Sequence, residues 1–218
     1  MIRFPSPTLP SIGLLGFSIA TASAALAAPV ASCSARSSAG VVPVVELYTS
    51  EGCSSCPPAD RWLSKLKAEP GVVALAFHVD YWDRLGWKDR FASPEFTRRQ
   101  AEQQRTSGTR FSYTPQVIVD GSDRRDWPGL GRAIAAMPGR AAPVDVQLSG
   151  EGNLFTATVG ASAAAPARLA AYWAVTEQDH VTAVKAGENE GVTLKHDNVV
   201  RDYRPVAAWA ARADTPQT

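Results

Sequence analysis

The chain has 218 residues, which is enough for one full domain or for a domain with a large extension. Its apolar content of 45%, its charged content of 20% and its formal net charge of +1 are ordinary for a globular protein. Because the sequence has no long basic run, its composition does not point to a nucleic-acid partner. Beyond the N-terminal segment, no stretch is long and apolar enough to cross a bilayer, so the mature chain is predicted to lack a transmembrane span.

The N-terminal segment has the pattern of a secretory signal peptide. Arg3 is its only charge, and residues 12–28 are apolar or small. An amphipathic or core helix is the alternative, but no polar face recurs along this stretch. Residues 1–28 are therefore predicted to be removed on export, which makes the mature protein periplasmic or secreted. Residues 29–40 are rich in Ser, Ala and Gly, and they are predicted to be a linker.

The chain has three cysteines, so one is left over if Cys53 and Cys56 pair with each other. The remaining cysteine, Cys33, follows a short apolar sequence similar to a bacterial lipobox, in which the cysteine becomes a lipidated first residue. Pro29 interrupts the apolar run before it, and better cleavage sites lie upstream. A free, exposed Cys33 is therefore the preferred interpretation, and a lipoprotein anchor is the alternative.

The next stretch predicts a buried strand, a short turn and a helix. Residues 41–48 are rich in Val and Leu on both faces, as in a strand covered on both sides. A Cys-Ser-Ser-Cys sequence follows at 53–56, and Pro57 and Pro58 favour a helix start. Apolar residues spaced at i, i+3, i+4 and i+7 extend this helix to about Ala68. A Cys-x-x-Cys pair in a strand-to-helix turn is typical of a thioredoxin-like redox pair.

A second buried strand is predicted at 72–79, with His78 and Asp80 at its carboxyl end. The order of elements over residues 41–140 is then β-α-β-α-β-β-α, which predicts a layered α/β unit with a thioredoxin-like core. Strands separated by helices are expected to cross over and run parallel. The later elements of this unit are a helix at 93–105, a short strand directly after Pro115, a hairpin strand at 124–127 and a helix at 130–137.

The pattern changes to strand-like alternation in residues 141–218. This part is small for an independent core, so it is expected to be a β-rich C-terminal segment that packs on the first unit. Its predicted strands lie at 144–148, 154–159, 168–175, 192–194 and 198–201.

Several motifs resemble one bacterial family, DUF1223. The similarity begins at residues 44–60, around the cysteine pair, and continues through 78–83, 113–117, 187–191 and 196–201. That family consists of exported proteins of unknown function with a thioredoxin-like fold. The resemblance implies a cis-proline, facing the cysteine pair, within the third of these motifs. It also implies that the last two motifs fold over the cysteine site.

The implied proline is Pro115, preceded by Thr114. Cis is the minority isomer of an X–Pro bond, so the surrounding structure must hold it. We therefore expect Thr114 and Pro115 to support the cysteine site.

The cysteine pair fits dithiol–disulfide exchange. Cys53 is expected to be exposed at the helix start, where the dipole favours its thiolate, and to attack the substrate. Cys56, buried beneath it, would resolve the mixed disulfide. Because Glu51 and Asp60 are negative, only a moderate lowering of the pKa of Cys53 is predicted.

Two alternatives remain for the cysteines. A structural disulfide would close a very short loop and would remove little chain entropy, so it would stabilise the fold little. A zinc site needs about four N or S ligands, and the remaining candidates, His78, His180, His196 and Cys33, have no tight spacing. No metal and no cofactor are predicted, although a copper-handling variant of the fold remains an alternative.

Three further polar residues are candidates to support the site. Glu46 lies in the first buried strand and either relays a proton to Cys56 or pairs with an Arg or Lys. His78 and Asp80 end the second strand, where ligand sites of α/β proteins gather. A satisfied structural histidine is the alternative for His78.

The sequence therefore predicts a thiol–disulfide oxidoreductase of the bacterial envelope that acts on protein thiols and disulfides. The chief alternative is a non-enzymatic binding module whose β-rich segment holds a ligand or partner while the cysteines are merely linked. Copper handling is the third interpretation. The oligomeric state does not follow from the sequence.

Overall fold

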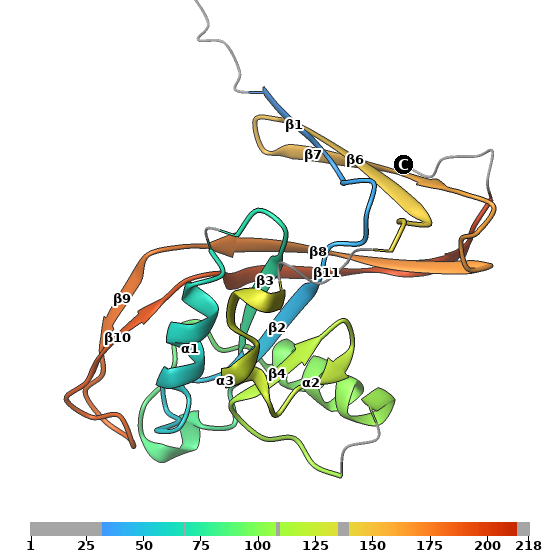
Figure 1. Ribbon diagram of the computed structural model, residues 1–218. Helices are drawn as coiled ribbons and strands as arrows, with labels where there is room; N and C mark the ends of the chain where they lie inside the picture. Colours follow the sequence, from blue (N-terminus) through green and yellow to red (C-terminus); the bar gives the residue numbers. More distant parts are fainter. Residues whose placement is uncertain (1–31, 68, 108–109, 135–139, 213–218) are drawn as a thin grey trace, which may run out of the picture.

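The computed structural model describes residues 32–67, 69–107, 110–134 and 140–212, so the predicted signal peptide lies outside it. The described residues form a mixed α/β fold with few helices (Figure 1). None of the described helices is both long enough and apolar enough to span a bilayer. The helices are α1 (Pro57–Ser64), α2 (Pro94–Ser107) and α3 (Trp127–Leu130), with two short 3-10 helices, η1 (Asp83–Leu85) and η2 (Gly131–Ile134).

The strands of the described residues belong to three sheets. Their orders are β1-β6-β7, β10-β9 and β5-β4-β2-β3-β11-β8. The strands are β1 (Ser32–Arg36), β2 (Val44–Thr49), β3 (Val73–His78), β4 (Gln116–Val119), β5 (Ser122–Asp123), β6 (Val144–Glu151), β7 (Leu154–Ala161), β8 (Arg168–Glu177), β9 (His180–Ala183), β10 (Thr193–His196) and β11 (Val199–Ala210).

Strand β2 lies inside the six-stranded sheet and is covered on both faces, as its apolar composition predicts. Val45 and Leu47 pack with residues of α1, including Leu63, in one buried cluster. Tyr48 packs on the other face with Phe96 of α2. This alternation places α1 and α2 on opposite faces of the sheet, because successive strand side chains point to opposite sides.

Strand β4 runs antiparallel to β2, so the expectation that all strands separated by helices run parallel is wrong here. Among the strands of residues 41–140, only β2 and β3 pair in parallel as expected. Phe77 near the end of β3 and Gln116 at the start of β4 both lie opposite Tyr48. The chain therefore leaves the sheet after β3 and re-enters it before β4 at the same end of the strands. Strand β4 must then run in the direction opposite to β2 and β3.

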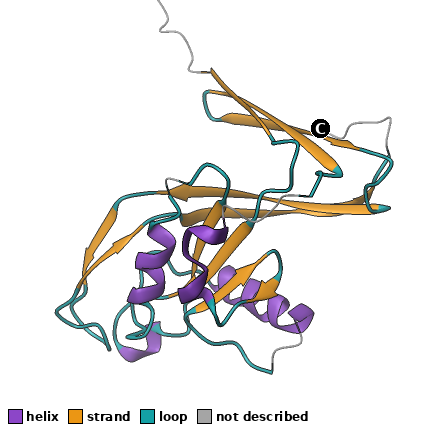
Figure 2. Cartoon of the chain, viewed as in Figure 1, coloured by secondary structure: helices purple, strands orange, loops and turns teal. Residues whose placement is uncertain are grey.

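The C-terminal segment contributes to the central sheet instead of forming a layer packed on it. Val199 of β11 pairs in parallel with Ala76 of β3, and β11 then continues antiparallel along β8. Val199 and Val200 are buried against the core. Figure 2 shows that this segment consists of strands and loops, as its alternating sequence predicts. Strands β11 and β8 of this segment extend the sheet and cover the edge of β3, which would otherwise be unpaired.

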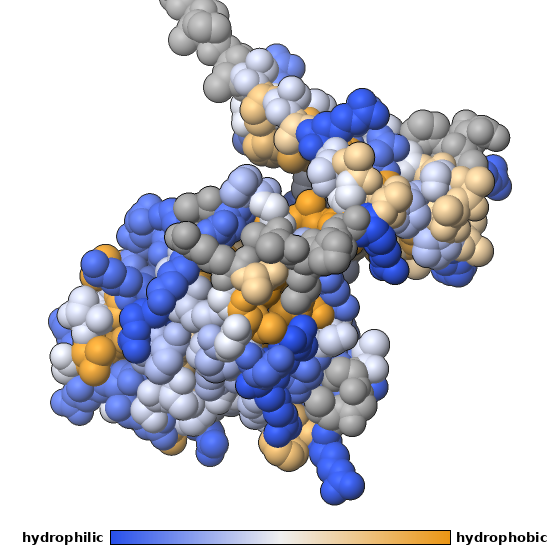
Figure 3. Space-filling view, viewed as in Figure 1, coloured by the Kyte–Doolittle hydropathy of each residue, from blue (hydrophilic) through white to orange (hydrophobic). Residues whose placement is uncertain are grey.

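Part of the predicted linker is also a strand. Residues Ser32–Arg36 form β1, which pairs antiparallel with β6. Backbone hydrogen bonds hold this exposed strand, so a Ser- and Ala-rich composition does not prevent pairing. Figure 3 shows hydrophobic side chains where this three-stranded sheet meets the rest of the molecule. A groove of about 760 Å³ lies there, with Phe155, Trp173 and Trp209 among its lining residues.

In the C-terminal segment, strand β9 was not predicted, and β11 continues to Ala210, beyond its predicted end at residue 201. In residues 41–140, local boundaries differ mainly in three places from those predicted. Helix α1 ends at Ser64 and is followed by turns, so it is shorter than its apolar spacing indicates. The two-residue strand β5 replaces the hairpin strand predicted at 124–127. The last helix of the first unit begins earlier, at Trp127, and continues as η2 to Ile134; residues 135–139 lie outside the described chain.

Candidate functional site

Cys53 and Cys56 form a disulfide in the turn between β2 and α1, with their Cα atoms 5.4 Å apart. The Cys53 N–H donates to the Ser50 carbonyl (3.2 Å), and the Cys56 N–H donates to the Cys53 carbonyl (3.1 Å). Cys56 is the N-cap of α1 and has helical dihedrals, φ −77° and ψ −36°. The helix therefore begins at Pro57, as the two prolines predict, and Cys53 lies in the turn just before it.

Both cysteines are fully buried, at 0% exposure, so the expectation that Cys53 is the exposed member of the pair is wrong. The loop between β9 and β10 covers the cysteine turn. The Asn189 side-chain amide donates to the carbonyls of Glu51 (2.8 Å) and Cys53 (2.9 Å). The Glu188 carboxylate accepts from the Ser54 N–H (3.0 Å) and hydroxyl (2.8 Å). Residues 187–191 thus fold over the cysteine site, as the family resemblance implies.

The Thr114–Pro115 peptide bond is cis and lies against the cysteine pair. The Thr114 hydroxyl is 3.3 Å from the Cys53 sulfur. The Trp82 indole N–H donates to that same hydroxyl oxygen (2.8 Å). Because this bond occupies a lone pair of the oxygen, it leaves the hydroxyl hydrogen free to point at the sulfur. The structure therefore brings Thr114, Pro115 and Cys53 together.

Glu46 lies on the other face of the sheet from α1. Its carboxylate accepts from Arg99 of α2 (2.5 Å) and from the Tyr172 hydroxyl of β8 (2.9 Å). Arg99 also donates to the Tyr48 hydroxyl. Of the two hypotheses for Glu46, the structure shows the ion pair, and the carboxylate is on the wrong face to relay a proton to Cys56.

Asp80 follows β3 but is directed to α2. The Asp80 carboxylate accepts a hydrogen bond from the Thr97 hydroxyl (2.5 Å), and the Asp80 backbone N–H donates to the oxygen of that hydroxyl (3.2 Å). These bonds fasten the end of β3 to α2. Of the two candidate residues at this strand end, only His78 points into the region beneath the cysteine turn.

A cluster of buried titratable side chains lies beneath that turn, and we call it the buried polar cluster: Glu51, Asp60, His78, Asp89 and His196. The His78 Nδ1 and Asp89 Oδ2 atoms are 2.6 Å apart, and the two histidine rings lie 5.0 Å apart. Glu51 Oε1 is 3.3 Å from His196 Nε2. Among the described residues, no group of three or more His, Cys, Asp or Glu side chains has an arrangement that could hold a metal ion.

The members of the buried polar cluster shift one another's pKa values. Burial alone would raise the pKa of Asp89, but the His78 charge and hydrogen bond, with two backbone N–H donors, lower it to about 2. Burial would lower the pKa of His78, and Asp89 raises it overall. Burial would likewise raise the pKa of Glu51, but His196 lowers it. Asp60 differs, because burial raises its pKa and the histidines offset only part of that effect.

Sequence reasoning found only part of this cluster. His78 was predicted from its place at a strand end, and Glu51 and Asp60 were considered only as nearby negative charges. Asp89 was missed, and His196 was considered only as a possible metal ligand and as part of a motif expected to fold over the site. Asp89 follows an irregular aromatic loop, and His196 arrives on β10 from the far end of the chain. No local spacing links them to the cysteines, and only the similarity of residues 196–201 to one family gave a signal.

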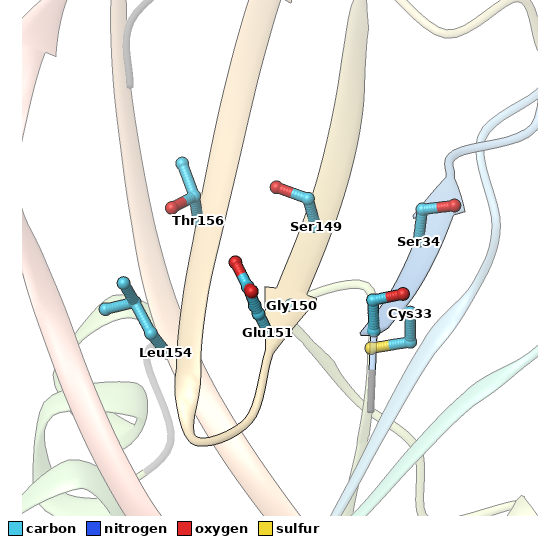
Figure 4. A pocket seen from close by; sticks show the side chains of 8 residues that line it. Cys33, Ser34, Ser149, Gly150, Glu151, Leu154 and Thr156 are labelled. Atoms are coloured by element: carbon cyan, nitrogen blue, oxygen red, sulfur yellow. The ribbon is translucent and has the colours of Figure 1, made fainter. Parts of the chain in front are cut away.

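Cys33 is a free, exposed cysteine, as predicted. It lies on β1 opposite Gly150 of β6, in the three-stranded sheet and not in the sheet that carries the cysteine pair. Figure 4 shows it at the edge of an open pocket that Ser149 and Leu154 also line. Cys33 is therefore no part of the candidate site.

The comparisons with known proteins give a family but no activity. The model of DUF1223, described as a protein of unknown function, matches residues 44–218. The X-ray crystal structure of a protein from Agrobacterium tumefaciens is similar, with 29% identity, a TM-score of 0.60, and coverage of 83% of this chain and 78% of that chain. No curated protein matches. The chain therefore belongs to DUF1223, a family of proteins of unknown function.

Proposed function

We propose that this protein is a thiol–disulfide oxidoreductase with a thioredoxin-like active site. The observation that carries the proposal is the Cys53–Cys56 disulfide at the start of α1, with the cis Thr114–Pro115 bond against the Cys53 sulfur. The order β2-α1-β3-α2-β4-β5-α3 supports a thioredoxin-like core. Strand-to-helix turns with paired cysteines are the usual setting of such redox pairs.

The exchange needs no cofactor, because electrons pass between sulfur atoms. In the reduced protein, the Cys53 thiolate attacks a substrate disulfide and forms a mixed disulfide, and Cys56 then displaces the substrate thiolate. The Thr114 hydroxyl, 3.3 Å from the Cys53 sulfur, would donate a hydrogen bond to the thiolate and lower the pKa of that thiol. The direction of exchange depends on the reduction potential relative to the compartment.

The proposed substrates are protein thiols and disulfides of the bacterial envelope. This location rests on the predicted signal peptide, residues 1–28, and makes the mature protein periplasmic or secreted. Disulfides form and persist in such compartments, so substrates of this kind are available there.

A second candidate is a binding module whose cysteines are only linked. The observation that favours it is the complete burial of Cys53 under Asn189 and its loop. Exchange requires an approach to the sulfur, so the proposed activity requires residues 187–191 to move away from the turn. A binding module would need no such movement.

An insulin-reduction assay separates the two candidates. The wild-type chain should accelerate insulin reduction by dithiothreitol, whereas Cys53→Ser and Cys56→Ser should not. All three proteins should carry Cys33→Ser, because Cys33 is a free, exposed thiol that could react by itself. A protein with both site cysteines that is no faster than the two variants would refute the oxidoreductase proposal and favour binding.

A further inference from the structure

Asp60 stands directly above Cys56 along helix α1. Cys56 has helical dihedrals, and the Asp60 N–H donates to the Cys56 carbonyl (3.1 Å). Side chains four residues apart on a helix lie on the same face, so the carboxyl and the sulfur share a side of α1. Both residues are buried, at 6% exposure for Asp60 and 0% for Cys56. A carboxyl group is therefore held beside the cysteine that must resolve the mixed disulfide.

One oxygen of this carboxyl lacks the partner that a buried carboxylate oxygen normally has. Its Oδ2 atom is buried and has no hydrogen-bond partner among the described residues. Burial raises the pKa of Asp60, while His196, His78 and the Thr49 hydroxyl act in the opposite direction. The titratable groups that face it from the surrounding elements are Glu51 after β2, His78 of β3, Asp89 before α2 and His196 of β10.

The members of that surrounding set are already paired. Asp89 is paired with His78, and Glu51 with His196. Among the described residues, Asp60 is the carboxyl of the buried polar cluster that has no cation of its own within ion-pair distance. An unpaired carboxylate costs far more free energy to bury than the neutral acid does. Asp60 therefore has reason to take up and release a proton when a charge appears next to it.

We propose that Asp60 exchanges a proton with the Cys56 thiol as the Cys53–Cys56 disulfide closes and opens. The inference rests on the proposed function and assigns a proton acceptor to it. When the disulfide closes, the Asp60 carboxylate takes the proton of the Cys56 thiol. The Cys56 thiolate attacks the Cys53 sulfur of the mixed disulfide, the new sulfur–sulfur bond forms, and the substrate leaves with the electron pair as its thiolate.

The reverse reaction balances in the same way. An incoming thiolate attacks Cys53 and forms a mixed disulfide, and Cys56 leaves as a thiolate that takes the proton of the Asp60 acid. The pKa of an ordinary thiol is about 8.5 and that of an ordinary aspartate about 3.9, so transfer between them is unfavourable. Burial raises the pKa of Asp60 towards that of the thiol, which reduces the mismatch.

The test separates the two steps of the exchange. The reduced protein, in a Cys33→Ser background, is mixed with excess dithiobis(nitrobenzoate), a coloured aryl disulfide. Attack by Cys53 releases one coloured thiolate, and resolution by Cys56 releases the second. In Asp60→Asn the first phase should be unchanged, and the second should be slower by about 100-fold near pH 7. The difference should disappear above about pH 9, where Cys56 ionises without help.

Glu46→Gln is the matched control, because it removes a buried carboxylate on the opposite face of the same sheet. It should leave the second phase unchanged. If Asp60→Asn also leaves that phase unchanged across the pH range, the role of Asp60 is refuted while the oxidoreductase proposal stands. If the protein with Asp60 shows no second phase and no insulin reduction, the proposed function itself fails.

A measurement on the unaltered site covers the case in which Asp60→Asn does not fold. The carboxyl carbon of Asp60 can be titrated by NMR in the oxidised and the reduced protein. In the reduced protein, Asp60 and the Cys56 thiol should titrate as a coupled pair, so the Asp60 carbon should also report the ionisation of Cys56, a step that the oxidised protein lacks. Identical Asp60 titration curves in the two redox states would overturn the proposal.

Discussion

His78 and Asp89 form a fully buried ion pair that also holds the cysteine turn in place. The Asp89 carboxylate accepts from the Glu51 N–H (2.9 Å) as well as from the His78 ring (2.6 Å). One carboxylate thus connects the end of β3 to the residues that lead to Cys53. At the residue scale, this pair supports the candidate site from beneath.

Asp89→Asn should lower the free energy of unfolding by about 3–5 kcal/mol, because it leaves a buried histidine without its counter-charge. The pKa of Asp89 is lowered to about 2, below its ordinary value of about 3.9. Its stabilising effect is therefore present above pH 4 and is lost as the pH falls towards 2. The raised pKa of His78 gives stabilisation that is complete below about 6.5 and is lost as the pH rises through the folded value.

Urea unfolding between pH 2 and pH 8 checks these signs. The wild-type protein should lose stability on the acid side of pH 4, and Asp89→Asn should lose less over the same interval. A variant with the wild-type unfolding midpoint at pH 5 would contradict the assigned pair.

The contact between the Thr114 hydroxyl and the Cys53 sulfur leads to a second prediction at this scale. A hydrogen bond to a charged group contributes about 1.5–3 kcal/mol, so Thr114→Val should raise the pKa of Cys53 by about 1–2 units. Thr114→Ser, which keeps the hydroxyl, should restore most of the effect. Ultraviolet thiolate absorbance measures the titration in a Cys33→Ser, Cys56→Ser background. Equal Cys53 pKa values in the Val and Ser variants would exclude a role for the hydroxyl.

At the scale of elements, the loop between β9 and β10 acts as a cover for the cysteine turn. Asn189 binds two buried carbonyls of that turn, and Glu188 binds Ser54 at the exposed end. These contacts join the C-terminal segment to the start of α1. Opening of this loop is the movement that the proposed exchange requires.

Asn189→Ala should remove both carbonyl contacts and lower the unfolding free energy by about 1–3 kcal/mol, since two buried acceptors lose their donor. In the reduced protein, it should also speed the reaction of Cys53 with iodoacetamide. Glu190→Ala, an exposed change in the same loop, is the matched control and should have neither effect. Unchanged alkylation in Asn189→Ala would show that this loop does not limit access to the sulfur.

The elements around the cysteine pair were predictable because their signals are local. The apolar residues of β2 and β3, and Pro57 at the start of α1, depend on neighbours in the sequence. The antiparallel direction of β4 and the pairing of β11 with β3 depend on where the chain returns to the sheet. The spacing of residues along the sequence does not show this. For the same reason the hypothesis for Glu46 stayed open, Asp89 was missed, and the contact of His196 with Glu51 was not predicted.

At the scale of the whole molecule, the two parts of the chain share one sheet. β11 lies between β3 and β8, and Val199 and His196 are buried among residues of the first part. A separate domain at 41–140 would leave the β3 edge unpaired and expose these apolar contacts. The division at residue 140 thus describes composition better than it describes packing.

A fragment of residues 41–140 should therefore lack a cooperative thermal unfolding transition. A fragment of residues 41–218, which removes only β1 from the described strands, should retain one, because β1 is exposed along its length. Circular dichroism measures both. A cooperative transition of residues 41–140 at the full-length midpoint would contradict the shared core.

The most direct test of the oxidoreductase proposal is the chemistry of the Cys53 sulfur. The reduced Cys33→Ser, Cys56→Ser protein is incubated with a peptide disulfide, and its intact mass is measured. The account predicts a stable adduct on Cys53, which is released when Cys56 is present. An unmodified Cys53 under the same conditions would contradict it.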